Sequence, residues 1–209
     1  MNMNLNFHSA GRSPVSLSLT ILACAIALIV APCSRAQESI LHVEPAQTKI
    51  EFSLGSSLHT VHGTFALKSC TIRFDPSSGS LSGAIVVDAT SGESGNSGRD
   101  ARMHREILES AKFPEIAFTP SQLKGKVAAD GASAVEVSGK FRLHGQDHDL
   151  TLPGEIVADG AKLQLAIHFV IPYVQWGLKN PSNFFLRASD KVEIDVHATG
   201  RLENGAAAH

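Results

Sequence analysis

Four histidines form two closely spaced pairs that are candidates for binding a metal ion. His59 and His62 are three residues apart, and His144 and His148 are four apart. Residues three apart on a β-strand face opposite sides, and the second pair flanks a turn at Gly145, so neither pair converges on one ion. We therefore expect solvent-exposed histidines at strand ends and no metal site, with His62 the first to test.

Other residue types that support catalysis lack the necessary pattern. The sequence contains no G-x-S-x-G elbow for a nucleophile, and the Gly- and Ser-rich stretch 91–98 has no Lys at the spacing of a phosphate-binding loop. Cys70 shares one face of a strand with Ile72 and Phe74, where a thiol is packing material. The sequence thus predicts a protein that is not an enzyme and has no cofactor.

The first 36 residues have the pattern of a secretory signal peptide. They contain no acidic residue, carry Arg12 before an apolar run at 15–30, and end in Ser34-Arg35-Ala36, which suits a cleavage site. The run is shorter than the about 20 residues of a membrane-spanning helix. We expect cleavage after Ala36 and a periplasmic or secreted domain at 37–209 with no stable membrane span. An uncleaved anchor, or a lipid on Cys24, is the alternative.

Removal of this segment changes the composition of the chain. The remaining domain has 16 basic and 20 acidic residues and one cysteine, Cys70. A single cysteine forms no internal disulfide, and a slightly acidic domain lacks the basic surface that nucleic-acid binding requires. The fold must therefore be held together by its apolar core.

Alternation of apolar and polar residues with a period of two dominates this domain. It is clearest at 135–144, where Phe141 lies between Lys140 and Arg142. We predict an all-β fold, a single extended antiparallel barrel of eight strands, in which each strand has one dry face. The other expected strands are 49–54, 59–67, 70–74, 81–89, 115–119, 122–127, 148–156, 163–169 and 191–198.

One short helix is predicted at 100–110, where Met103, Ile107 and Leu108 share a face and could close one end of the barrel. Asp100 is expected as its N-cap, worth about 1 kcal/mol. Arg99 is expected to pair with Asp100 or with a carboxylate at the barrel rim, or else to meet the polar head of a ligand.

The predicted inner face is rich in phenylalanine, since the chain has 10 Phe against 1 Trp and 1 Tyr. Phenyl rings have no polar atom to satisfy, so they suit either a filled core or a channel for an apolar ligand. Gly63, Gly83 and Gly139 alternate in step with the apolar, inward-facing residues of their strands. They mark either barrel curvature or room for such a ligand. The candidate ligand-binding residues are Phe52, Phe65, Ile85, Val87, Phe118, Phe141, Ile167, Phe169 and Trp176.

The order of several short motifs resembles the YceI-like family over residues 41–200. These motifs are Val61-His62-Gly63-Thr64-Phe65, the segment 137–145 with 148–152, and the stretches 48–52, 85–91, 99–100 and 113–118. The resemblance implies an exported bacterial protein with a lipocalin-like barrel that holds a long apolar chain such as a polyisoprenoid. Members often carry an Arg-x-x-Phe-Gly type segment near the C-terminal end, where this chain has 172–177 and a loop of its own.

These observations lead to one main hypothesis and two competing ones. The main hypothesis is a non-enzymatic protein that holds a polyisoprenoid, an isoprenoid quinone or a similar amphiphile for transport or storage. Under this hypothesis the partner is an apolar lipid, the protein binds no nucleic acid, and a homodimer is an allowed assembly. The first alternative is a periplasmic metal-binding or stress-related redox protein that uses the histidines. The second is a structural module with a filled core.

Overall fold

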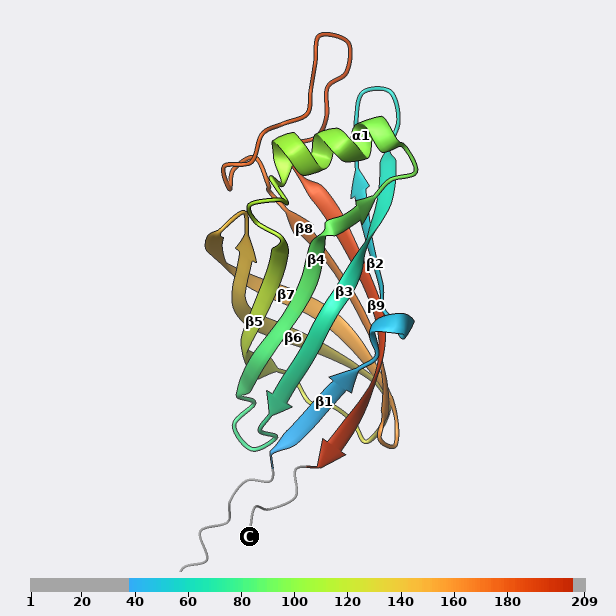
Figure 1. Cartoon of the computed structure of the whole chain (residues 1–209). Coiled ribbons are helices and arrows are strands. Elements are labelled where there is room, and N and C mark those ends of the chain that lie inside the picture. Colours follow the sequence, from blue (N-terminus) through green and yellow to red (C-terminus); the bar gives the residue numbers. More distant parts are fainter. Residues whose placement is uncertain (1–37, 205–209) are drawn as a thin grey trace, which may run out of the picture. The chain divides into compact units, whose positions relative to one another are not determined.

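The computed structural model describes residues 38–204, and the predicted signal peptide at 1–36 lies outside this range. Nine strands and three short helical elements make up the described chain (Figure 1). The strands are β1 (Ser39–Val43), β2 (Lys49–Leu54), β3 (Val61–Phe74), β4 (Leu81–Glu93), β5 (Glu115–Lys124), β6 (Asp130–Leu143), β7 (Gln146–Asp159), β8 (Lys162–Ile171) and β9 (Val192–Asn204). The helical elements are η1 (Pro45–Gln47), α1 (Ser97–Arg102) and the π-helical turn η2 (Met103–Ile107).

Strands β2 to β9 form a closed antiparallel ring, which confirms the predicted eight-stranded barrel. The hydrogen-bonded order runs from β3 through β2, β9, β8, β7, β6 and β5 to β4, and β4 pairs back with β3. The sequence did not predict β1. It pairs with the ends of both β3 and β9 and extends the wall where the short β2 is absent.

The alternating pattern has the expected structural meaning in β6. Val135, Phe141 and Leu143 are buried, whereas Lys140 and Arg142 between them are exposed. The turn to β7 consists of two residues, His144 and Gly145, both with positive φ, as a tight hairpin that follows the twist of its strands requires.

Two strands each join two segments that the sequence pattern indicated as separate strands. The segments predicted separately at 59–67 and 70–74 form one strand, β3, whose register with β4 shifts near Thr64 and Leu67. Likewise β5 continues through Pro120, where its register with β6 shifts. A bulge adds a residue to one strand and reverses the alternation beyond it, so a continuous strand appears as two in the sequence.

The inward glycines make room for aromatic rings of the protein itself. A Cβ atom on Gly63 would lie 2.4 Å from the Phe52 ring and 2.3 Å from the carbonyl oxygen of Glu93. On Gly139 it would lie 2.8 Å from the Phe118 ring. Of the two alternatives for these glycines, room for a ligand is therefore wrong at Gly63 and Gly139, because phenyl rings occupy that space.

The helical cap begins earlier than predicted and has a different N-cap. Helix α1 starts at Ser97, and the side chain of Asn96 accepts a hydrogen bond from the Arg99 backbone N–H at 3.0 Å. Asp100 lies inside the helix, so its predicted capping role is wrong. Asn96 was missed because asparagine also fits the Gly- and Ser-rich loop in which it occurs. Figure 1 shows α1 across one end of the barrel, at the opposite end from β1.

Candidate functional site in the barrel interior

An apolar cavity of about 130 Å³ lies beneath the cap. Its wall comes from β2 and β3, with Phe52 and Phe65 among the lining residues. Its roof comes from η2, through Ile107, and from the segment 172–191, through Leu178 and Pro181. Met103 and Leu108 also line it, so the apolar helix face predicted from the sequence does point into the barrel.

The interior side chains are in contact with one another but are not sealed from solvent. The large apolar residues of the described core keep between 5% and 9% of their surface exposed. Phe65, Ile85 and Ile167, which also face inward, are only partly buried. Of the buried residues, Phe52, Leu143 and Ile171 line the cavity. Side chains in a close-packed core have neighbours on all sides, and these three have the cavity on one side.

The nine candidate ligand-binding residues all belong to the larger apolar cluster of the interior. Phe52, Phe118 and Phe141 are buried members of it, and the other six pack against them. Two of the nine, Phe52 and Phe65, line the cavity itself. A second, smaller cluster around Val135 closes the interior toward β1.

A group of aromatic rings outside the cavity lining packs together on the inner face of the barrel. Phe141 lies 6.1 Å from Phe169 and 5.8 Å from Trp176, measured between ring centroids. The imidazole of His148 stacks on Trp176 with centroids 4.0 Å apart and ring planes 5° from parallel. His148 is the antiparallel partner of the buried Phe141 and therefore shares its inward face.

The histidines divide into two groups, and the expectation that all four are exposed is wrong for two of them. His59 and His62 are exposed as predicted, whereas His144 and His148 are half-buried. The Nε2 atoms of these two are buried and have no hydrogen-bond partner among the described residues. In β7, His148 alternates in step with Leu150 and Leu152, which face inward. This position was a signal in the sequence that His148 also faces inward.

The described residues contain no group of three or more His, Cys, Asp or Glu side chains that could hold a metal ion. His62 instead lies 2.9 Å from the hydroxyl of Ser53. His144 packs against the Phe113 ring, and its Nε2 is 3.6 Å from a Glu109 oxygen, too far for a hydrogen bond.

The charged pair at the start of the cap has a structural partner, Ser94. Arg99 donates from Nε to the Ser94 hydroxyl and from Nη2 to its carbonyl, each at 2.7 Å. Asp100 accepts from the Ser94 N–H at 3.0 Å and also from its hydroxyl. The predicted pairing of Arg99 with a carboxylate is therefore wrong, because both side chains close the same loop around one serine.

His104 fixes the cap to the barrel, a role that sequence reasoning missed. Its Nε2 is 2.8 Å from the carbonyl oxygen of Gly92 on β4, and its Nδ1 is 3.0 Å from the buried hydroxyl of Ser110. A carbonyl only accepts, so Nε2 carries the hydrogen and a neutral ring accepts at Nδ1. Its position on the polar side of the predicted helix gave no hint of this contact.

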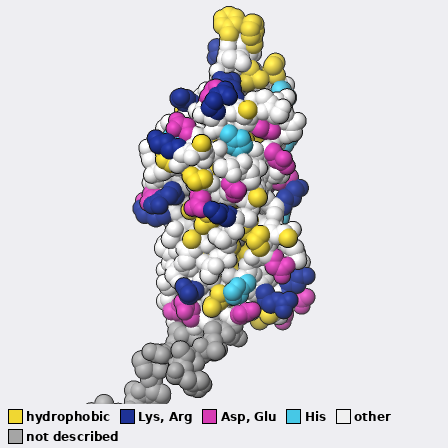
Figure 2. All heavy atoms as spheres, viewed as in Figure 1, with side chains coloured by type: hydrophobic (Ala, Val, Ile, Leu, Met, Phe, Trp, Pro, Cys, Tyr) yellow, Lys and Arg dark blue, Asp and Glu magenta, His cyan; other side chains and the backbone are white. Residues whose placement is uncertain are grey.

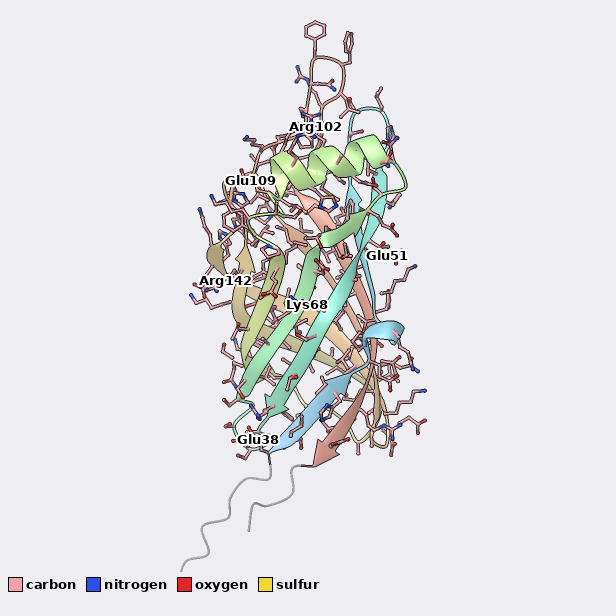
Figure 3. The ribbon with its side chains drawn as sticks, viewed as in Figure 1. Glu38, Glu51, Lys68, Arg102, Glu109 and Arg142 are labelled. Atoms are coloured by element: carbon pink, nitrogen blue, oxygen red, sulfur yellow. The ribbon has the colours of Figure 1, made fainter. Side chains whose placement is uncertain are left out.

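Loop 172–191, which joins β8 to β9, is held by hydrogen bonds at its middle and at its base. Arg102, labelled at the capped end of the barrel in Figure 3, donates to the carbonyl of Pro181 at 3.0 Å and links the loop to α1. At its base the buried Tyr173 hydroxyl donates to the carbonyl of Ser189 at 2.6 Å. Burial, with a smaller effect of nearby Asp190, raises the pKa of Tyr173 to about 12. The roof of the cavity is thus a hydrogen-bonded unit.

Comparison with known proteins assigns this barrel to a family. The model of the YceI-like domain matches residues 41–200, which span nearly all of the barrel. The chain belongs to the YceI-like family. The UPF0312 protein VPA0850 of Vibrio parahaemolyticus is 29% identical over 150 residues, which cover 69% of this chain and 75% of that protein.

Two solved structures share the fold of this YceI-like protein. BcnA of Burkholderia cenocepacia has a TM-score of 0.62 at 18% identity and covers 75% of this chain and 98% of its own. A polyisoprenoid binding domain from Saccharophagus degradans has a TM-score of 0.58 at 14% identity, with coverage of 78% and 98%.

Proposed function

We propose that this YceI-like protein is an exported, non-enzymatic binding protein that holds a long apolar lipid of isoprenoid type in its barrel. The observation that carries the proposal is the lining of the interior, where inward apolar side chains keep residual exposure around a cavity without polar walls. The polyisoprenoid binding domain of Saccharophagus degradans, which shares the fold, supports the choice of ligand class.

The chemistry of this lining suits a ligand that makes few hydrogen bonds. A polyisoprenoid chain offers only hydrocarbon surface, so its binding energy comes from buried area at roughly 25 cal/mol per Å². Phenyl and branched aliphatic side chains supply such surface without leaving a polar group unsatisfied. Phe52, Phe65 and Phe141 are therefore expected to contact the chain of the ligand.

Entry of a long ligand requires the roof of the cavity to move. The cavity of about 130 Å³ is smaller than the roughly 300–1,000 Å³ of typical small-molecule sites. Its roof consists of η2 and loop 172–191, whose contacts with the barrel are a few hydrogen bonds and apolar contacts. We expect this roof to move outward when the ligand enters.

His148 is suited to contact a polar head of the ligand. Its Nε2 atom is buried among apolar side chains and has no hydrogen-bond partner in the described part of the chain. A buried polar atom without a partner costs about 1–3 kcal/mol, and a carbonyl oxygen of an isoprenoid quinone would remove that cost by accepting from Nε2–H.

Native mass spectrometry of the protein purified after export tests the proposal directly. We expect one lipid of isoprenoid type per barrel, recovered on organic extraction, and uptake of added isoprenoid quinone by the emptied protein. N-terminal sequencing of the same sample should begin at Gln37. A barrel that is empty on isolation and takes up no isoprenoid would overturn the proposal.

A variant that fills the cavity provides the specific control. Ile107→Trp places a larger side chain under the roof, whereas Arg105→Trp puts the same side chain on the exposed side of the same turn. The indole ring would occupy space that the ligand needs, and a steric conflict of about 1–3 kcal/mol in the complex would weaken lipid binding about five- to hundredfold. Arg105→Trp should bind as the parent does, and equal losses in both would contradict an interior site.

A further inference from the structure

The largest exposed apolar side chains of the described protein gather at the capped end of the barrel. Phe184 and Phe185 are 95% and 84% exposed, and their rings contact each other edge to face at a centroid distance of 5.1 Å. Leu58, in the β2–β3 loop, is 70% exposed. We call these three residues the apolar tip. Figure 1 shows loop 172–191 reaching beyond α1, away from the barrel.

Hydrogen bonds hold the tip in this exposed position. The Asn183 side chain accepts from the backbone N–H groups of Phe185 and Leu186, both at 2.9 Å. Below this turn, the N–H of Ser57 donates to the carbonyl of Arg187 at 2.8 Å. That bond joins the loop with Phe184 and Phe185 to the loop with Leu58. The protein thus presents apolar side chains to water on an ordered support.

The charges of the loop that carries the two phenyl rings are mainly basic, although the described chain is acidic overall. Loop 172–191 carries Lys179, Arg187 and Lys191 against the single acidic Asp190, and all four are exposed. Figure 2 shows Lys and Arg side chains just below the hydrophobic end of the molecule, with Asp and Glu side chains among them. Aromatic side chains beside basic ones fit the interface of a bilayer that contains anionic lipids.

We propose that the apolar tip docks this protein on an anionic lipid bilayer, with the rings of Phe184 and Phe185 inserted among the headgroups. The same loop supplies Leu178 and Pro181 to the roof of the cavity. Docking would therefore place the membrane next to the part of the barrel that must open. The role of docking in lipid exchange rests on the proposed function, whereas docking itself does not.

Vesicle flotation tests the docking, with protein purified after export so that residues 1–36 take no part. We expect the parent to float with vesicles of phosphatidylglycerol mixed with phosphatidylcholine, less with phosphatidylcholine alone, and less at high salt. Phe184→Ser/Phe185→Ser should lower the membrane partition constant at least about tenfold. The transfer of even one phenyl ring out of water changes this constant by about that factor. Val157→Ser/Val170→Ser, which removes exposed apolar side chains of the barrel wall, is the matched control.

Three results would overturn the docking proposal. They are absence of flotation by the parent, equal flotation of the parent and the Phe184→Ser/Phe185→Ser variant, and a parent dimer that this variant converts to monomer. The last would make a second copy of the chain the occupant of the tip. Uptake of isoprenoid quinone from detergent is measured on the same variants. Lost docking with intact uptake would leave the proposed function standing, and lost uptake with intact docking would do the reverse.

Discussion

At the scale of single residues, His148 is the polar exception in the interior. Its ring stacks on Trp176 and its Nε2 has no hydrogen-bond partner among the residues that the structure describes. In His148→Leu, the lost stacking of about 0.5–1.5 kcal/mol is offset by removal of an unsatisfied polar atom. We expect the free energy of unfolding to change by less than about 1 kcal/mol.

Ligand binding should respond differently to the same His148→Leu change. Affinity for an isoprenoid quinone should fall about two- to tenfold, the value of one net hydrogen bond, while affinity for a hydrocarbon isoprenoid stays the same. Trp176 is the single tryptophan of the chain, so its fluorescence in ligand titrations measures both affinities. Equal losses for the two ligands would contradict a headgroup role of His148.

Cys70 is a second inward residue whose environment sets its chemistry. Burial raises the pKa of its thiol from 9.0 to about 11, and the thiolate is the reactive form. In a Cys24→Ser/Cys33→Ser background, native Cys70 should react with a thiol reagent at pH 8 about a hundredfold more slowly than in denaturant. Its native rate should keep rising beyond pH 9 toward pH 11. A plateau near pH 9 would show an exposed thiol instead.

At the scale of elements, the sequence predicted strands well wherever alternation was unbroken. In β6 and β7 the pattern, the turn at His144-Gly145 and the pairing all agree with the structure. The strand β1 was missed because five residues give too short an alternating run, and its place depends on contacts with β3 and β9 far along the chain. The true length of β3 was hidden by its two register shifts.

The candidate site was predictable only in part, for a related reason. The alternation of side chains along a strand separates inward from outward residues, and it correctly predicted that Phe52, Phe118 and Phe141 face inward. Roof residues such as Tyr173 and Leu178 lie in a loop without periodicity, so nothing local in the sequence indicated that they cover the cavity. The contact between His104 and Gly92 is likewise tertiary and leaves no trace in the sequence pattern.

In the β2–β3 pair, the Phe52 ring packs over Gly63 of the neighbouring strand. Substitution of this glycine tests the contact. In Gly63→Ala the added Cβ atom would lie 2.4 Å from the Phe52 ring and 2.3 Å from a backbone oxygen. We expect a loss of about 1–3 kcal/mol in the free energy of unfolding, the usual cost of overpacking. Denaturant titration measures it.

Gly55→Ala is the matched control for this substitution. No atom lies within 4 Å of the position that its Cβ would take. Its stability should stay the same or rise by up to about 1 kcal/mol, since alanine reduces the freedom of the unfolded chain. If both variants lost the same stability, the change would reflect the general cost of replacing glycine in this region rather than the ring of Phe52.

At the scale of the whole molecule, the barrel combines a closed wall with an incompletely filled interior. A closed ring of strands has no free edge that would pair with other chains, because the backbone groups of each strand are paired within the barrel. No helix in the described residues is long and apolar enough to span a membrane. The proposed ligand would complete the packing that the side chains leave open.

Because the ligand would complete the packing of the interior, bound lipid should raise the free energy of unfolding. A ligand that binds only the folded state adds about 2.7 kcal/mol at a free concentration of 100 times Kd. For a chain of this size that corresponds to an increase of about 5–10 °C in Tm. Thermal unfolding of lipid-loaded and lipid-free protein measures the difference. Arg105→Trp should show the full increase, and Ile107→Trp little of it, because only the second blocks the cavity. An increase that survives in Ile107→Trp would place the stabilising lipid on the surface of the barrel rather than inside it.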